Sequence, residues 1–435
     1  MIRRRGGIVR LPAVIAAAAL AVILSACGGA AEARNAAVDT ADIVITSAAE
    51  ATEAETDIDG ENASAVDDTA DAGEETETET ETEMTEDKEM EKEITAVWMW
   101  TESISGIGAD AVFDDCANAG VTDVYLLTKG LKGTVAFDTP LAPPAVRGHD
   151  ILREALDAAH ARGIRVHAWF TSASDATYKS EHPESGLCHY VRKRNNDVIS
   201  MNDEGYALYM ESVITDLVKR YDVDGIHLDY IRYNHLTYGW SEDDYADLES
   251  RGADVGHIKE LMDKTFYGAS PDGTSIFDAY RAGDEDVLIL AAKRREDVCR
   301  FAERLTAAAR AERPDIILSA ALMPEGAFTS DLAFPDLHYG QNYADLSRIF
   351  DVFLPMAYSK AYGMSDSWVG EATRGALGCG VKVVTGIQCY DGGTIDSMKR
   401  DSKAALDSGA DGICLFRYGT DEWKRAVRVW LTERE

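Results

Sequence analysis

The sequence predicts a (β/α)8 barrel over residues 94–435, and two features of the chain carry this prediction. From residue 94 onward, short apolar runs alternate eight times with amphipathic stretches. The apolar runs are continuous rather than interrupted by polar residues, which is typical of parallel strands that are buried on both faces. A doubly wound open sheet is the alternative architecture, but no glycine-rich phosphate loop follows the first run.

The expected elements alternate along the chain. The strands are expected at 96–100, 122–128, 164–170, 222–230, 315–323, 351–358, 381–390 and 411–418. The helices, with apolar residues at helical spacing, are expected at 109–120, 149–163, 206–221, 294–313, 342–350, 367–379, 394–409 and 421–434. Gly163 is a good helix stop. We expect a long irregular insertion after the fourth strand, over roughly 231–291.

The first 27 residues have the order of a secretion signal. Three arginines at 3–5 precede the apolar run LPAVIAAAALAVIL, and LSA precedes Cys27. A basic start, a short apolar core and a cleavage site describe an export signal rather than a spanning helix. The cysteine directly after LSA resembles the bacterial lipoprotein signal, so we expect Cys27 to be lipidated and to hold the protein at a membrane surface. Ordinary secretion with a chance cysteine is the alternative.

Residues 28–93 are expected to form a disordered acidic tether. They contain 23 Asp and Glu against 3 Lys and Arg, with the near-repeat EETETETETEMTED and no aromatic residue. Such a segment cannot bury enough apolar surface to offset its chain entropy, and its like charges extend it. A solvated spacer is therefore expected here, and not a binding site.

Charge and cysteine content restrict the partners. The net charge is −34, and removal of the tether (−20) and the signal (+4) leaves −18 for residues 94–435. An acidic folded domain argues against nucleic acid as a partner. Six cysteines follow Cys27 without a CxxC pair or zinc-ligand spacing, and those at 389 and 414 lie in apolar runs as expected buried thiols.

The fourth expected strand, in the stretch VDGIHLDYIRYN, carries the strongest candidate catalytic residue. Alternation places Gly225, His227 and Asp229 on one face of the strand and the intervening apolar residues on the other. The apolar face suits the helix layer, so Asp229 should point inward at the rim. In a barrel, active groups lie where strands end, at the C-terminal face.

Cleavage of a glycosidic bond needs two carboxyl groups, an acid for the leaving oxygen and a nucleophile or base. We assign Asp229 as nucleophile or base, with a pKa lowered by Arg232 or Lys129. Glu325, directly after the fifth strand, is the candidate acid because that strand should neighbour the fourth. Rival acids also lie near strand ends: Glu102, Asp391 and Glu371.

Polar and aromatic residues at the other strand ends are the candidate substrate-binding set, since aromatic faces stack on sugar rings. The set comprises Trp100, Lys129, His167, Trp169, His227, Arg232, Tyr233, Tyr358, Gln388 and Tyr390. His227 and Arg232 are expected to orient the sugar or to tune Asp229. A metal-dependent hydrolase would usually carry an HxH pair on the first strand, and AVWMW has none, so we expect neither a metal nor an organic cofactor.

Several of these stretches resemble the bacterial glycosyl hydrolase-like family ten. The matching stretches are WMW, VHAWF, YDVDGIHLDYIRY, DVFLPMAY and VVTGIQCY, and the likeness covers most of 94–430. The resemblance implies a (β/α)8 barrel, often lipid-anchored or secreted, that is associated with cleavage of glycan strands, including peptidoglycan. It also implies a catalytic carboxylate at Asp229 and substrate-binding neighbours.

Together these features predict a membrane-anchored, extracytoplasmic glycoside hydrolase. The expected organisation is a signal over 1–27, a tether over 28–93 and a catalytic barrel over 94–435. The expected substrate is a cell-wall or environmental polysaccharide, with peptidoglycan among the candidates. The alternative is a surface lipoprotein that binds glycan without cleaving it.

Overall fold

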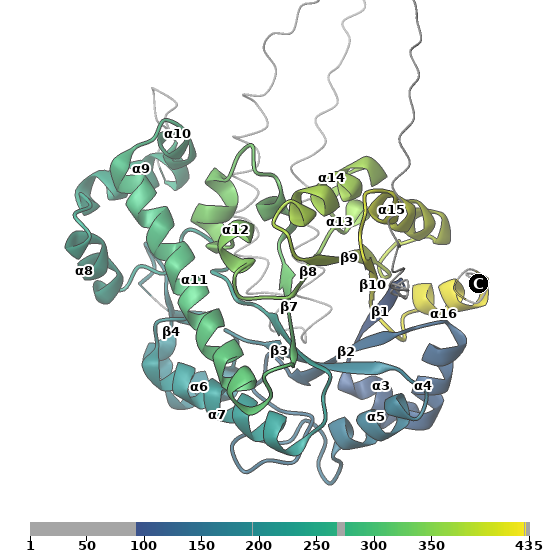
Figure 1. Ribbon diagram of the computed structural model, residues 1–435. Coiled ribbons are helices and arrows are strands. Elements are labelled where there is room, and N and C mark those ends of the chain that lie inside the picture. Colours follow the sequence, from purple (N-terminus) through teal and green to yellow (C-terminus); the bar gives the residue numbers. More distant parts are fainter. Residues whose placement is uncertain (1–92, 194, 268–274, 430, 432–435) are drawn as a thin grey trace, which may run out of the picture.

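Residues 93–193, 195–267, 275–429 and 431 are described by the computed structural model, and they form a closed parallel barrel (Figure 1). Its strands, in barrel order, are β1 (Ile94–Met99), β10 (Gly412–Phe416), β9 (Lys382–Gln388), β8 (Val352–Pro355), β7 (Ile317–Leu322), β6 (Gly225–Asp229), β3 (Arg165–Thr171) and β2 (Asp123–Lys129). β2 pairs in turn with β1, which closes the ring. The predicted (β/α)8 barrel is confirmed.

Helices surround this ring, and each barrel strand is followed in the chain by at least one helix (Figure 1). They are α3 (Thr101–Ile107), α4 (Ala109–Asn118), α5 (Ile151–His160), α7 (Glu204–Arg220), α11 (Glu285–Glu312), α12 (Tyr343–Leu346), α13 (Ser359–Tyr362), α14 (Asp366–Leu377), α15 (Ile395–Asp407) and α16 (Asp421–Val429). Many of these helices are capped at the N-terminus by a side chain. The Asp203 carboxylate caps α7, and the Asp150 carboxylate caps α5. Capping of this kind satisfies backbone N–H groups that have no partner within the helix.

The barrel strands bury apolar side chains on both faces. One cluster lies inside the barrel, and the other lies between the strands and the helices. Ile226 and Leu228 of β6 belong to the cluster that the helices cover, together with Val213 of α7. The inner cluster contains Trp98 and Tyr125, and the His227 ring packs against both. The expected alternation of β6 is therefore confirmed, with His227 turned inward.

The insertion after β6 differs from the expected irregular segment. It contains α8 (Glu242–Ser250), α9 (Val255–Phe266) and α10 (Ile276–Arg281), which pack on the first part of α11. These helices bury an apolar cluster of their own, with Trp240 and Leu248 among its members. Two capping boxes, at Ser241 and Ser275, begin α8 and α10, so local sequence signals define these helices.

A small antiparallel hairpin and a short helix occupy the connection after β3. The hairpin pairs β4 (Gly186–Cys188) with β5 (Asn195–Ile199), and α6 (Ala176–Glu181) precedes it. The sequence did not predict these elements. Both the hairpin and the insertion follow the C-terminal ends of strands, so they lie on the side where Asp229 ends β6.

The described residues contain no helix long and apolar enough to cross a membrane. Cys389 and Cys414 are buried thiols, as expected, and the other described cysteines are also free. The expected signal, lipidated Cys27 and all of the acidic tether except Glu93 lie outside the described residues.

Candidate functional site

Asp229 lies at the C-terminal end of β6 and is only 5% exposed. Its carboxylate accepts hydrogen bonds from Trp169 Nε1 at 3.2 Å and from the backbone N–H of Tyr230 at 2.7 Å. Arg232 lies 3.3 Å away and forms a buried ion pair with it. Three donors therefore fix the orientation of this carboxylate, which is the arrangement that a nucleophile or a base requires.

The pKa of Asp229 differs in direction from the sequence expectation. Burial raises this pKa above its ordinary value, although Arg232 and the hydrogen bonds from Tyr230 and Trp169 oppose the change. Loss of hydration penalises the charged carboxylate more than its one cationic neighbour favours it. The predicted lowering by Arg232 or Lys129 was wrong.

The backbone turns sharply directly after Asp229. Tyr230 has a φ of 56°, in the left-handed region that side chains other than glycine rarely adopt. This turn brings the Tyr230 N–H back onto the Asp229 carboxylate. Arg232 then lies over the Tyr230 ring, 4.5 Å from its centroid. Backbone strain of this kind concentrates at functional sites.

Glu325 follows β7 in a short helical turn, Pro324–Ala327, and is half-buried. Its Oε2 atom is buried and accepts no hydrogen bond from the described residues. Burial raises the pKa of Glu325 to about 7, against opposing effects of its own backbone, Arg232 and Tyr362. A carboxyl group with this pKa is about half protonated at pH 7, so it can donate a proton.

The charge of Arg232 acts on both carboxyl groups. Arg232 forms the ion pair with Asp229, and its charge also acts on Glu325. Tyr362, at the end of α13, also lowers the pKa of Glu325, and the charge of Arg232 lowers the pKa of Tyr362 in turn. The structure therefore brings the predicted pair, Asp229 and Glu325, to neighbouring strand ends with a shared cation.

The rival acids have other surroundings. Glu102 lies in α3, Glu371 in α14 and Asp391 in the loop after β9, and all three are exposed. A solvated carboxyl group lacks the burial that raises the pKa of Glu325. We therefore retain Glu325 as the candidate acid.

Aromatic residues from the last strands gather at the same end of the barrel. The Tyr358, Tyr390 and Phe416 rings pack against one another, with centroids 5.6–5.8 Å apart. Trp169 meets Phe416 edge to face at 6.4 Å. Trp100, at the end of β1, lies beneath the Arg417 guanidinium. Trp100, Trp169, Tyr358 and Tyr390 of the predicted binding set thus come together near Asp229.

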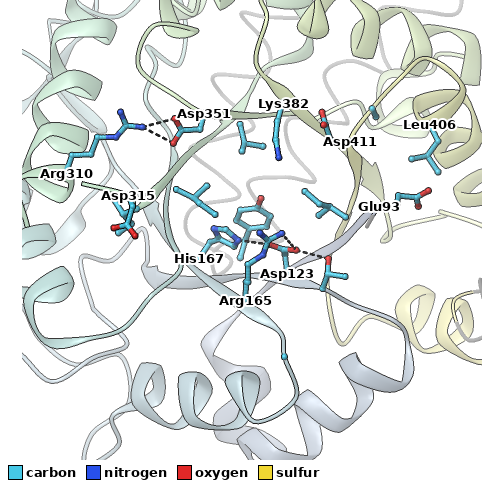
Figure 2. Close-up of a pocket in the computed structure, with 18 of the residues that line it drawn as sticks. Glu93, Asp123, Arg165, His167, Arg310, Asp315, Asp351, Lys382, Leu406 and Asp411 are labelled. Atoms are coloured by element: carbon cyan, nitrogen blue, oxygen red, sulfur yellow. Dashed lines mark hydrogen bonds and ion pairs between the residues drawn. The ribbon is translucent and has the colours of Figure 1, made fainter. Parts of the chain in front are cut away.

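The two histidines of the predicted set lie elsewhere. His227 is fully buried, its Nε2 bonded to Trp98 Nε1 and its Nδ1 to Ser319 Oγ. Burial holds its pKa well below the ordinary value, so the ring is neutral. His167 Nε2 lies 2.8 Å from Asp123 Oδ1, toward the starting ends of the strands (Figure 2). Neither ring is at the C-terminal face, which corrects their expected role in binding substrate there.

Three further residues of the predicted binding set form buried contacts that stabilise the fold. Lys129 is fully buried and pairs with Asp175 at 3.1 Å. The Tyr233 hydroxyl donates to Asp297 beneath the insertion. The Gln388 side chain accepts from the Ala361 N–H and donates to the Tyr390 and Asp391 carbonyls, which ties two loops together. These contacts pair Lys129 and Tyr233 with carboxylates other than Asp229 and occupy the amide of Gln388.

A large cavity of about 930 Å³ opens at the opposite end of the barrel (Figure 2). Its lining comes from residues where strands begin, among them Asp123, Arg165, Lys382 and Asp411. Asp123 is paired with Arg165 and His167, and Asp411 accepts from the backbone N–H of Val383. These polar groups hold the starts of the strands in place. The cavity is separate from the Asp229 site, which lies where the strands end.

One group of possible metal ligands occurs among the described residues, in the insertion: His257, Asp284 and Asp286. Asp284 caps α11 and bonds His257 Nε2 at 2.8 Å, while Asp286 accepts from the backbone of Asp254. These atoms already join the starts of α9 and α11. Their arrangement fits a helix junction and does not bear on Asp229.

The sequence profile of the glycosyl hydrolase-like 10 family matches residues 142–373, a span that includes both Asp229 and Glu325. The chain belongs to this family. Among curated proteins, none matches the sequence. The family assignment confirms the resemblance read from YDVDGIHLDYIRY.

Solved structures share the barrel of this glycosyl hydrolase-like 10 protein. The PgaB (BpsB) glycoside hydrolase domain from Bordetella bronchiseptica matches with a TM-score of 0.57 and 13% identity, over 77% of this chain and 96% of its own. The catalytic domain of beta-amylase from Paenibacillus polymyxa matches with a TM-score of 0.54 and 11% identity, over 79% and 98%. The beta-galactosidase from the psychrophilic Marinomonas ef1 matches with a TM-score of 0.53 and 15% identity, over 75% and 54%. At these identities the likeness shows the fold alone.

Two tyrosines near the candidate site were not predicted from the sequence. Tyr362 lowers the pKa of Glu325, and Tyr339 raises the pKa of Arg232. Both lie in connections after β7 and β8 rather than on strands. The spacing from Tyr358 to Tyr362 in AYSKAY is the one local signal for the first of them. Tyr339 has no such signal, because tertiary packing alone brings it to Arg232.

Proposed function

We propose that the protein is a glycoside hydrolase that cleaves a polysaccharide with Asp229 and Glu325 as its two carboxyl groups. The pair itself carries the proposal: three donors hold the Asp229 carboxylate, and burial raises the pKa of the neighbouring Glu325 to about 7. One group suited to attack and one suited to donate a proton are what glycoside hydrolysis requires.

In this mechanism the Glu325 proton passes to the glycosidic oxygen as the bond from that oxygen to the anomeric carbon breaks. Asp229 either attacks the anomeric carbon or removes a proton from the attacking water. Arg232 balances the negative charge of Asp229 before attack. The rings of Trp169, Tyr358 and Tyr390 supply the apolar faces on which a sugar would stack.

Substrate and location complete the proposal. Peptidoglycan glycan strands are the first substrate to test, because the resemblance of the sequence stretches implies cleavage of glycan strands and the N-terminal sequence resembles a lipoprotein signal. We propose that Cys27 carries the lipid. The described chain enters β1 at the end of the barrel opposite Asp229. An anchored barrel would then present Asp229 away from the attachment end.

The test uses the full-length protein with a panel of polysaccharides that includes peptidoglycan, and measures the release of reducing ends. We expect Asp229→Asn to retain glycan binding and to lose at least about 1,000-fold in turnover, since the reacting carboxylate is gone. Glu325→Gln should recover much of its lost rate on aryl glycosides, whose leaving groups need no proton. Glu303→Gln on the exposed face of α11 is the matched control.

The alternative function, glycan binding without cleavage, is favoured by one observation, the 5% exposure of Asp229. A binding protein would retain glycan while the wild type released no reducing ends from any member of the panel. Unchanged release by Asp229→Asn would refute the assignment of this residue.

A further inference from the structure

A single side chain bridges the two loops that carry the candidate carboxyl groups. Gln341 is fully buried and follows the turn Pro335–Tyr339. Its Oε1 accepts a hydrogen bond from the Met323 N–H at 2.9 Å. Its Nε2 donates to the Ile231 carbonyl at 3.3 Å. One amide thus joins the chain after β6 to the chain after β7.

Both anchor points are close in sequence to the candidate site. Ile231 is two residues beyond Asp229 and directly precedes Arg232, while Met323 is two residues before Glu325. A change in the length or chemistry of the bridge would therefore move one carboxyl group relative to the other. No side chain within this bridge belongs to the carboxyl pair itself, so the role is indirect.

Neighbouring contacts make the Glu325 side of the bridge rigid. The Tyr343 hydroxyl donates to the Met323 carbonyl at 3.1 Å, so Met323 is held through both its N–H and its C=O. Gly326 packs so closely that a Cβ there would lie 2.7 Å from the Tyr343 ring and 2.9 Å from the Gln341 carbonyl oxygen. The loop that carries Glu325 has little freedom to shift independently.

The bridge is supported from outside by α11. Gly340 has a φ of 66°, and a Cβ there would lie 2.6 Å from the Arg294 carbonyl oxygen, so only glycine fits. The buried Arg294 guanidinium donates to the carbonyls of His338 and Tyr238. The backbone N–H of Tyr233 also donates to the Tyr339 carbonyl at 3.0 Å. The segment before Gln341 is therefore fixed to the insertion and to the loop of Arg232.

We infer that Gln341 is a positioning residue that sets the separation of the Asp229 and Glu325 carboxyl groups. The inference rests on the proposed function, for which that separation decides whether water or the carboxylate itself attacks. A buried amide that only satisfies two backbone groups would stabilise the fold without acting on the pair. The experiment must distinguish these roles.

Three variants of the full-length protein separate length from chemistry. Gln341→Asn keeps the amide but is one methylene too short to span both loops. Gln341→Glu keeps an acceptor for the Met323 N–H and loses the donor to the Ile231 carbonyl. Gln341→Met keeps the approximate shape and loses both hydrogen bonds. The matched control is Thr373→Val, which removes a buried hydrogen bond between Thr373 and Thr385, on α14 and β9.

We expect Gln341→Asn and Gln341→Met to lower kcat by about 100-fold, as a displacement of about 1 Å would, with KM within about twofold of the wild type. Gln341→Glu should be intermediate, and the pH profile of kcat should shift in all three. Thr373→Val should lower Tm without moving the pH profile. Wild-type kcat and pH profile in Gln341→Asn, or a loss that merely follows Tm as in Thr373→Val, would overturn the inference.

A second measurement keeps the test independent of catalysis. The titration of Glu325 can be followed by NMR of ¹³C-labelled glutamate, with Glu325→Gln to assign the signal. Gln341→Met should move the midpoint, because it changes the position of Glu325 relative to Arg232. An unchanged midpoint would refute the positioning role even if the wild type proves to be a binding protein, whereas a shifted midpoint without turnover would count only against the proposed function.

Discussion

Glu325 shows how strongly burial can change one residue of a loop. Its carboxyl group has an ordinary pKa of 4.5, and desolvation raises this to about 7. Arg232 opposes the change but does not reverse it. In the unfolded chain this residue would titrate like any other glutamate, so the proton that Glu325 retains near neutral pH is a property of the folded site.

This shift has a consequence for stability. Between pH 4.5 and about 7 the folded protein binds the Glu325 proton more tightly than the unfolded chain does. The contribution of the group to stability is therefore fully present below pH 4.5 and is lost as the pH rises through 7. Glu325→Gln removes this titration, so we expect it to gain about 1–3 kcal/mol over the wild type on going from pH 5 to pH 8.

Urea unfolding of both proteins at pH 5 and pH 8 checks this expectation, with the exposed Glu303→Gln as control. A difference between Glu325→Gln and the wild type that stays the same at both pH values would contradict it. A gain in stability with a loss of turnover would be the trade-off common at active sites.

At the scale of elements, aspartates at strand starts hold neighbouring strands together. Asp224, Asp351 and Asp411 each precede a strand by one residue. Their carboxylates accept from the backbone N–H groups of Val166, Leu318 and Val383, respectively, at 2.7–2.9 Å. Each acceptor thus ties the start of one strand to its neighbour in the barrel, which satisfies an N–H that the sheet leaves unpaired.

Asp351 permits a test, since it also pairs with Arg310. Both partners of that ion pair are nearly half exposed, so the pair should contribute little, whereas the hydrogen bond to the Leu318 N–H should matter. We expect Asp351→Ala to lower the free energy of unfolding by about 1–2 kcal/mol. Asp351→Asn and Arg310→Ala should each cost less than about 1 kcal/mol. Equal losses for Asp351→Ala and Arg310→Ala in denaturant titrations would indicate that the ion pair dominates.

The insertion was predicted as irregular although its helices have readable starts. Ser241 and Ser275, which cap α8 and α10, each precede an aspartate by three residues. Asp254 and Asp284 cap α9 and α11. The aspartate cap also explains why α11 begins at Glu285 rather than at the predicted 294. The helices α8 and α10 are short, so apolar periodicity is hard to read in them, but the caps of all four helices could have been found from sequence.

At the scale of the whole molecule, the direction of the chain bears on the proposed lipid anchor. Residues 28–93 carry a net charge of −20, and the barrel that follows is also acidic. The barrel meets this segment at the start of β1, where strands begin, and the candidate site lies where strands end. The proposed anchor would therefore leave the site free to meet a polymer.

Cys27 provides the test at this scale. We expect Cys27→Ser to abolish lipid attachment in a bacterial host and to move the protein from the detergent phase to the aqueous phase on Triton X-114 partitioning. The half-buried Cys379→Ser is the matched control and should partition like the wild type. Recovery of Cys27→Ser in the detergent phase would refute lipidation at this residue.

The sequence by itself determined the eight strands, their parallel order and the inward direction of Asp229, because these follow from local periodicity and from the geometry of a strand. It did not determine how deep a side chain lies along the barrel axis, so His167 and His227 were expected at the mouth. Only the tertiary structure decided that Lys129 pairs with Asp175 and that the charge of Arg232 acts on both Asp229 and Glu325. The raised pKa values and the bridge through Gln341 have the same origin, since both depend on segments far apart in the chain that exclude water from one small volume.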